Sequence, residues 1–266
     1  MQPLELKRGL YLAPEFKNIE ADGILAATTS YKHPIKTGSW HYHENAMVCF
    51  VLKGGNVEKR KGIEFERLPG RVTFYHAGEL HQNIYKLFPA KGFNLEIEPH
   101  FLQQYQVSET DINASLKTNP KAQFSMYKIY KELAMNDKFS VSSAHILLLD
   151  IIASGKRIHQ RKAPPWIATI IEVLNDRWNE NVTLNDLSRT CNVHPITISK
   201  YFSLYFQCTL GDYQRKLKVA KAVMLIQSLN TSLTDITYHC GFSDQSHFVR
   251  IFKRQTGFLP KEFQKL

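Results

Sequence analysis

The sequence lacks the features of a membrane or secreted protein. Its best apolar run, residues 146–153, is too short to span a bilayer and is interrupted by Asp150. The first residues form no apolar signal segment, because Pro3, Glu5 and Lys7 fall among them. We therefore expect a cytoplasmic protein with no membrane partner.

The sequence also lacks the motifs of several common sites. It contains no P-loop, no dinucleotide-binding glycine pattern and no nucleophile elbow. Its cysteines form no C-x-x-C pair, which indicates free thiols in a reducing compartment. These four residues are Cys49, Cys191, Cys208 and Cys240. We expect no catalytic residue and no cofactor, so the protein is not predicted to be an enzyme.

At 266 residues the chain is long enough for two domains, and its formal net charge of +10 suits a nucleic-acid partner. The charge is spread along the chain, however. Residues 166–266 hold 12 Lys and Arg against 8 Asp and Glu. Charge alone leaves DNA as one possible partner among several. The pattern of the C-terminal residues is needed to identify the partner.

The C-terminal region carries two helix–turn–helix patterns in tandem. In the second, we expect a short helix that begins after Thr234 as N-cap and stops at Gly241, followed by a helix capped by Ser243 or Asp244. The inward side chains of that helix recur at spacings of three and four: Phe248, Ile251 and Phe252. The opposite face carries Gln245, Ser246, His247, Arg250, Lys253 and Arg254. Such a face suits a major groove, where amide and guanidinium groups reach base edges and cations contact phosphates.

The first pattern repeats this design over residues 182–206. Its scaffold helix has the inward stripe Val182, Leu184 and Leu187, and Val193 fills the turn. Its second helix buries Ile198 and Phe202 and presents the outward residues Ile196, Thr197, Ser199, Lys200 and Ser203. This face is less polar than the other, so we expect it to read fewer bases. A helical pattern over residues 210–229 joins the two units.

The segment GFSDQSHFVRIFKRQTGFLPKEFQ, with LGDYQRKLKVAKAVMLI before it, closely resembles the AraC/XylS-type transcription regulators. In that family both recognition helices enter successive major grooves of promoter DNA and are held apart by the linker helix. The resemblance places base-facing residues at Ile196, Ser199, Lys200, Gln245, Ser246, His247 and Arg250. The sequence departs from the family pattern at three positions, where His194, Asn192 and Thr237 replace the usual Ser, Gly and Ala.

In the N-terminal half, from about Gly23 to Pro99, apolar and polar residues alternate with a period of two. Glycine-rich turns are expected at residues 53–55, 61–62, 69–70 and 91–92. Many short strands joined by such turns predict an antiparallel barrel or sandwich. A closed barrel leaves a cavity that can hold one small ligand.

Three histidines are expected to face that cavity. His41 and His43 share one face of a strand, and His81 follows the turn at residues 69–70. The spacing resembles the cupin motifs, although Met47 occupies the place of the usual Glu. Three such histidines could hold a divalent Zn, Fe or Ni ion, bind a ligand without metal, or be ordinary core residues. Because the carboxylate is missing, we expect no metal.

Aromatic residues near those histidines suit a sugar or another polar small molecule, although an ordinary core role is the favoured alternative for any one of them. They are Trp40, Tyr42, Tyr75 and Tyr85. Tyr85 lies an even number of residues from His81, so the two can share one face of a strand. We therefore assign the ligand site to His41, His43, His81 and Tyr85.

The predicted fold is a strand-rich N-terminal domain with appended helices and an all-helical C-terminal domain. We expect a cupin-like barrel over residues 1–107, a helical dimerisation segment over 108–154, a linker over 155–165 that begins where Gly155 stops the helix, and a DNA-binding domain over 166–266. The helical segment has more apolar surface than the barrel needs, which favours a homodimer, although packing on the barrel is an alternative.

The favoured function is a sequence-specific transcription regulator whose barrel senses a small-molecule effector. By resemblance it activates transcription through RNA polymerase at promoter DNA. Two other functions stay open. One is a metal-dependent cupin enzyme fused to a DNA-binding domain, and the other is a barrel that only dimerises.

Overall fold

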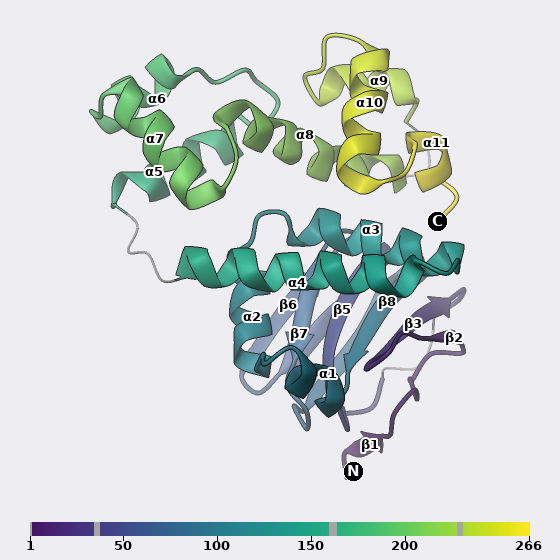
Figure 1. Cartoon of the computed structure of the whole chain (residues 1–266). Helices are drawn as coiled ribbons and strands as arrows, with labels where there is room; N and C mark the ends of the chain where they lie inside the picture. The colour runs from purple at the N-terminus through teal and green to yellow at the C-terminus, as the bar shows by residue number, and fades with distance from the viewer. Residues whose placement is uncertain (1, 35–37, 160–163, 228–230) are drawn as a thin grey trace. The chain divides into compact units, whose positions relative to one another are not determined.

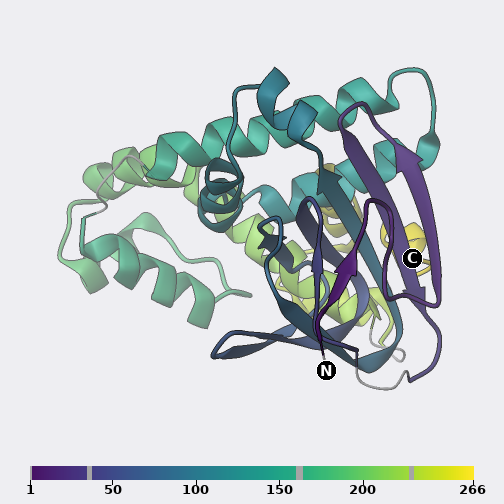
Figure 2. The same ribbon diagram turned by 90° about the horizontal axis from the view of Figure 1, so that it is seen from below.

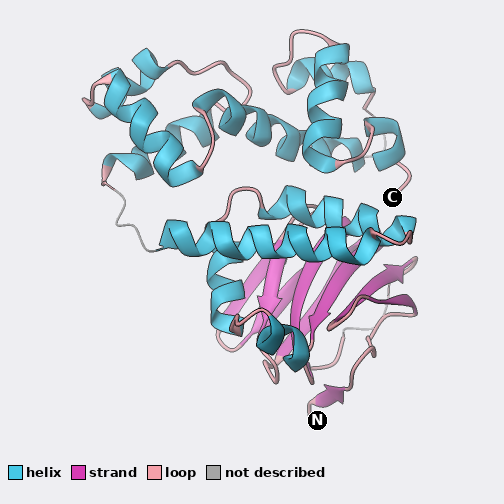
Figure 3. Cartoon of the chain, in the orientation of Figure 1, coloured by secondary structure: helices cyan, strands magenta, loops and turns pink. Residues whose placement is uncertain are grey.

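The computed structural model describes residues 2–34, 38–159, 164–227 and 231–266. Its contacts divide the chain into two compact units, Met1–Gly155 together with Leu266, and Lys156–Lys265. The first unit is rich in strands and the second is helical (Figure 3), as the predicted fold class requires. None of the described helices is both long enough and apolar enough to cross a membrane.

The first unit contains a sheet of eight strands followed by helices (Figure 1). The strands are β1 (Leu4–Leu6), β2 (Glu15–Glu20), β3 (Ile24–Tyr31), β4 (His41–His43), β5 (Ala46–Arg60), β6 (Ile63–Arg67), β7 (Val72–Tyr75) and β8 (His81–Ile97). The helices are α1 (Pro99–Gln104), α2 (Glu109–Thr118), α3 (Ala122–Met135) and α4 (Ser140–His159).

The sheet has the order β1-β4-β8-β3-β2, and β5 pairs with β6, β7 and β8. All of these pairs are antiparallel except β1 with β4, which is parallel. Strands β5 and β8 are 15 and 17 residues long, and register shifts interrupt their pairing between Val51 and Asn56. Figure 2 shows from below how the sheet curls.

Two of the predicted turns are wrong. Gly54, with φ +70°, lies inside β5 at the register shift, and Gly92 lies inside β8. At Gly92 a Cβ would stand 2.7 Å from the Thr29 hydroxyl, so glycine serves the close approach of a neighbouring strand. The turns at Gly62 and Gly70 are confirmed, and both residues have positive φ.

Strand β5 and the last five residues of β8, residues 93–97, are largely buried on both faces. Phe50 packs edge-on against Tyr127 of α3, and Phe93 packs against Tyr130 of the same helix. The alternate residues, such as Asn94, line a cavity on the other face. The polar residue Asn94 is therefore buried too, because it faces the cavity and not bulk water.

The predicted helix end at Gly155 is wrong, because α4 continues to His159. Gly155 lies against Ser115 of α2, and a Cβ there would stand 2.3 Å from the Ser115 Cα. The Ser115 hydroxyl donates to the Ile152 carbonyl at 2.9 Å. Glycine at 155 thus allows two helices to pack closely. Residues 160–163 of the predicted linker lie outside the described residues, and the predicted boundaries at 107 and 154 stay predictions.

The second unit consists of helices. They are α5 (Trp166–Asp176), α6 (Leu184–Cys191), α7 (Pro195–Phe206), α8 (Leu210–Gln227), α9 (Leu233–His239), α10 (Gln245–Thr256) and α11 (Pro260–Phe263). Helices α5, α6 and α7 enclose one apolar core around Ile170, Leu187 and Phe202, and Tyr213 and Leu217 of α8 pack against it. Of the four free cysteines, Cys49 and Cys240 are buried and the other two are half-buried.

Candidate DNA-binding surface and ligand cavity

The second helix–turn–helix unit is formed by α9 and α10. Helix α9 begins after Ser232, whose hydroxyl accepts from the Asp235 N–H at 3.1 Å, so the predicted N-cap Thr234 is wrong. At the turn, Gly241 has φ +68°, and a Cβ there would stand 1.8 Å from the Asn179 carbonyl oxygen. Only glycine fits this position, because both the backbone conformation and the neighbouring chain exclude a side chain.

Helix α10 starts at a carboxylate cap. The Asp244 side chain accepts from the His247 N–H at 2.7 Å, and this bond lowers the pKa of the Asp244 carboxyl. Phe248 and Phe252 are fully buried, as predicted. The predicted outward residues Gln245, Ser246, Arg250, Lys253 and Arg254 are exposed. His247 is half-buried with its ring against Phe242, and Arg254 is 3.5 Å from Asp212 of α8.

The first helix–turn–helix unit is formed by α6 and α7. Helix α6 starts at a capping box in which the Thr183 hydroxyl and the Asp186 carboxylate each accept the other residue's N–H. Asn192 takes the left-handed conformation, with φ +52°, where the resembled family usually has Gly. His194 caps α7, because its ring Nδ1 accepts from the Ile196 N–H at 3.3 Å. Both departures from the family pattern therefore keep the local structure.

The outward face of α7 carries the predicted residues Ile196, Ser199 and Lys200, all exposed. Ile198 and Phe202 are fully buried on the other side. Counted from the N-cap, Lys200 is the sixth residue of α7, as Arg250 is of α10. The two helices thus present a cation at the same place.

Helix α8 joins the two units (Figure 1). The Gln214 side chain pairs with the Val182 backbone through two hydrogen bonds of 2.9 Å, which attaches α8 to the first unit. Lys218 Nζ donates to the Gly241 carbonyl at 2.7 Å, which attaches the same helix to the second unit. These bonds attach one helix to the segment before α6 and to the turn between α9 and α10.

A cavity of about 60 Å³ lies within the strand-rich N-terminal unit, residues 1–155. All four residues predicted for the ligand site line it: His41, His43, His81 and Tyr85. Tyr31 stacks on Tyr85 at 3.8 Å. None of the described residues that line the cavity is Asp or Glu, whereas Lys53, Arg67 and Lys91 do line it.

The other predicted aromatic residues lie elsewhere. Trp40 is exposed and Tyr42 points away from the two histidines beside it. Tyr75 is buried and stacks on His81 at 3.9 Å, behind the cavity wall. Only Tyr85 of this group lines the cavity.

The histidines form one cluster of neutral rings. Nδ1 of His41 lies 2.8 Å from the Ser39 carbonyl and Nδ1 of His81 lies 2.9 Å from the Glu79 carbonyl. A carbonyl oxygen only accepts, so Nδ1 carries the proton in both rings and Nε2 keeps its lone pair. Burial lowers the pKa of all three rings. The pKa of His43 falls to about 3 and that of His81 falls to about 2.

This cluster has the ligand atoms for a divalent metal. Nitrogen atoms of His41, His43 and His81 lie within 4.8 Å of one another, and all three residues are buried. Neutral imidazoles held by Nδ1–H bonds to carbonyls are typical of metal ligands. Met47 leaves the set without the expected carboxylate, so an ion there would have three protein ligands and open positions.

Sequence reasoning missed several polar residues of the cavity. Asn83 lies between His81 and Tyr85 on β8 with the same parity, and its position could have been predicted. Asn56 pairs with Tyr85 across β5 and β8, which requires the register. Arg67 ends β6, and no local pattern distinguishes it from a surface arginine.

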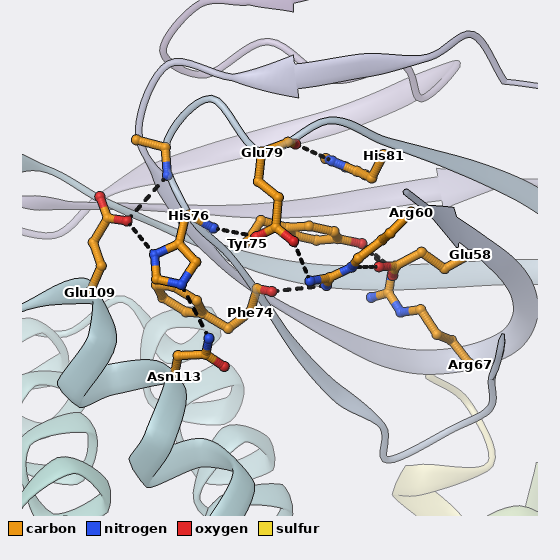
Figure 4. Close-up of polar contacts among 11 residues, drawn as sticks. Glu58, Arg60, Arg67, Phe74, Tyr75, His76, Glu79, His81, Glu109 and Asn113 are labelled. Atoms are coloured by element: carbon orange, nitrogen blue, oxygen red, sulfur yellow. Dashed lines mark hydrogen bonds and ion pairs between the residues drawn. The ribbon is translucent and has the colours of Figure 1, made fainter. Parts of the chain in front are cut away.

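A chain of polar contacts begins at Arg67, which lines the cavity (Figure 4). Arg67 Nη1 donates to the Tyr75 hydroxyl at 2.9 Å, and that hydroxyl donates to Glu58 Oε2 at 2.5 Å. Glu58 is fully buried. Arg60 bonds both to Glu58 and, at 2.6 Å, to Glu79 Oε1. A buried charge pair of this kind is costly to disrupt, so the contacts hold their members together.

The same chain reaches helix α2 through Glu79. Its second carboxylate oxygen accepts from the His76 N–H at 2.9 Å, and its carbonyl accepts from His81. The His76 ring joins α2, with Nδ1 2.7 Å from Glu109 Oε2 and Nε2 3.2 Å from Asn113 Nδ2 (Figure 4). The cavity wall and α2 are therefore linked by continuous hydrogen bonds.

Known proteins resemble this chain over one or both units. Residues 187–266 match a helix-turn-helix domain family. The transcriptional activator RhaS of Escherichia coli is 25% identical, over 85% of this chain and 87% of its own. The probable transcription factor PqrA of Proteus vulgaris is 30% identical, over 33% of this chain and 71% of its own.

A solved structure of ToxT from Vibrio cholerae, bound to an unsaturated fatty acid, is 12% identical, covers 91% of this chain and 94% of its own, and has a TM-score of 0.38. The helix–turn–helix match, the tandem units joined by α8 and the similarity to PqrA agree with the family resemblance of the sequence. The chain belongs to the AraC/XylS-type transcription regulators.

Proposed function

We propose that this member of the family binds promoter DNA through α7 and α10 and that a small molecule bound in the cavity controls it. One observation carries the DNA-binding part: two capped helices on one scaffold present exposed polar faces, with Lys200 and Arg250 at matching positions. In helix–turn–helix proteins such faces enter the major groove.

The proposed DNA contacts fall into two groups. Residues toward the N-terminal ends of the helices face bases: Ile196, Ser199, Lys200, Gln245, Ser246, His247 and Arg250. Lys253 and Arg254 contact phosphates near the end of α10. Genome-wide mapping of bound sites in the cell, followed by footprinting with the purified chain, tests this. A chain that protects no site from cleavage would contradict the proposal.

The similarity to RhaS, which is named as an activator, supports activation of transcription through RNA polymerase in the cytoplasm. We infer that the protein acts as a homodimer. The described apolar side chains on and between α3 and α4 support this, because Met135, Phe139 and Ile146 are 60%, 62% and 68% exposed. Sedimentation of the chain, compared with an Ile146→Lys variant, tests the homodimer.

The effector site is proposed at His41, His43, His81 and Tyr85. Cavities that hold small molecules commonly measure about 300–1,000 Å³, so a sugar would have to displace lining side chains here. Binding and a change of shape are therefore coupled. That coupling is what a sensor needs, since an effector shifts an equilibrium only if it binds one arrangement more tightly.

The proposed route of the change is the polar chain from Arg67 to Glu109 on α2. Helix α2 in turn is bonded to α4 through Ser115 and Asn119. A displaced cavity wall would move α2 and α4, and α4 leads along the chain into the DNA-binding unit. The Glu109→Gln variant should still bind effector and no longer change DNA affinity in response. The Glu20→Gln variant, which loses an exposed ion pair with Arg8, should respond normally.

A thermal-shift screen of sugars and other polar metabolites identifies the effector, because a ligand of the native state raises the unfolding temperature. If no compound raises it and Tyr85→Ala leaves regulation intact in the cell, the domain only dimerises.

The histidine cluster favours one alternative, a metal-dependent enzyme attached to a DNA-binding domain. Metal analysis of the purified protein distinguishes this enzyme from a regulator that binds its effector without metal. A stoichiometric ion that is lost in a His43→Ala variant, with turnover of a metabolite, would support the enzyme.

A further inference from the structure

Ile196 is the most exposed large hydrophobic side chain among the described residues, at 72%. It is the second residue of α7, and its N–H is held by the His194 cap. The core of this unit does not use it, because Ile198 and Phe202 fill the interior from the other side of the helix. Its exposure therefore has no explanation in the fold.

The surroundings of Ile196 are polar. The residues three, four and seven positions further along α7 share its face and are exposed: Ser199, Lys200 and Ser203. A large apolar patch would indicate a protein partner, whereas one isoleucine among hydroxyl and ammonium groups does not form such a patch. At the same position of α10 the chain has Ser246.

We propose that Ile196 recognises the C5-methyl group of a thymine in the major groove. The inference rests on the proposed binding of DNA by α7. The N-terminal residues of the second helix of a helix–turn–helix are those that contact base edges. Thymine is the base that offers an apolar group in the major groove, and apolar side chains read it.

The side chain is suited to this role. In a helix, isoleucine strongly prefers one χ1 rotamer, so its methyl groups are presented to the base with little loss of freedom. Lys200, one turn further on the same face, is placed to hold the helix against the duplex by its charge. The first unit thus selects thymine by an apolar contact, whereas the second selects bases by hydrogen bonds.

The test uses the full chain and a genomic fragment that it binds. Each thymine of the site is replaced in turn by deoxyuridine, which removes only the methyl group. Wild-type protein should bind about fourfold more weakly at one position, the worth of one buried methyl group. The Ile196→Ser variant should bind thymine and deoxyuridine equally there, and Ile196→Val should still distinguish them.

Leu204→Ser is the matched control. This side chain lies two turns further on α7 and is also exposed, so its loss should leave the discrimination unchanged. If the wild type tolerates every deoxyuridine, or if Ile196→Ser keeps the full loss, the inference is overturned while DNA binding stands. If no genomic fragment is bound at all, the proposed function is overturned and this inference with it.

Discussion

Helices α7 and α10 are both 12 residues long, and each begins at a side-chain cap. Each ends before a residue with positive φ, Gln207 in one and Gly257 in the other. In both units the residue after the left-handed turn position donates to a carbonyl five residues back, Val193 to Ser188 and Phe242 to Thr237. The two units therefore share one backbone design.

Their outward faces differ. At the ninth and tenth positions α7 has Ser203 and Leu204, where α10 has Lys253 and Arg254. The cap of α7 is an imidazole and that of α10 is a carboxylate. One scaffold thus carries two kinds of surface. We expect the second unit to supply most of the electrostatic affinity and the first to add specificity by shape and apolar contact.

The largest expected effect comes from a substitution that unfolds the second helix–turn–helix unit and leaves the first one folded. Phe248→Ala removes a fully buried ring from the second unit and should cost about 3–5 kcal/mol of stability. Hydrogen exchange measured by mass spectrometry should then rise in α9–α11 and less in α5–α7. Ile196→Ala, an exposed site, is the control and should change neither. A Phe248→Ala protein of normal stability would contradict the core assignment.

Alanine substitution should destabilise the turns of the two helix–turn–helix units to different extents. Gly241→Ala places a Cβ against the Asn179 carbonyl, so its cost should exceed the about 1–2 kcal/mol of a left-handed residue alone. Asn192→Ala in the first unit meets only that conformational cost. Urea denaturation of the two variants measures the difference. Equal midpoints would show that the contact with Asn179 is not restrictive.

In DNA binding, Arg250→Ala should weaken the specific complex by about 1–3 kcal/mol, because a guanidinium at a base edge is lost. Lys200→Ala, at the same position of α7, should cost less, since an ammonium group binds without the paired hydrogen bonds of arginine. Titration against the operator and against unrelated DNA separates the specific loss. An unchanged operator affinity in Arg250→Ala would mean that α10 is misplaced.

Much of this comparison is predictable from sequence, for local reasons. The stripe of Phe248, Ile251 and Phe252 and the cap Asp244 are set by neighbours within one turn of helix. Ser232 was missed although Asp235 follows it at capping-box spacing, because Thr234 offered a competing hydroxyl. The close approach of the Asn179 carbonyl to Gly241 could not be predicted, because Asn179 is distant from Gly241 in sequence.

The cavity was only half predictable. Alternation along the strands, a local property, predicts four of the lining residues: His41, His43, His81 and Tyr85. The chain from Arg67 through Glu58 to Glu109 depends on which strands pair and in what register. Gly92 and Gly155 were misjudged because a glycine that permits close packing looks the same in sequence as one that makes a turn.

The smallest effect concerns charge alone. Lys253→Ala should weaken binding to all DNA sequences and reduce the slope of log affinity against log salt by about one, as one phosphate contact is lost. The reciprocal variant Ser203→Lys puts a cation at the matching position of α7 and should steepen the slope by a similar amount. Filter binding over a range of salt concentrations measures both slopes. If Ser203→Lys changes nothing while Lys253→Ala flattens the slope, the end of α7 lies away from the phosphates and the two helices do not dock alike. If neither variant alters the slope, the cations of α10 do not contact the backbone, and the electrostatic contrast between the units disappears.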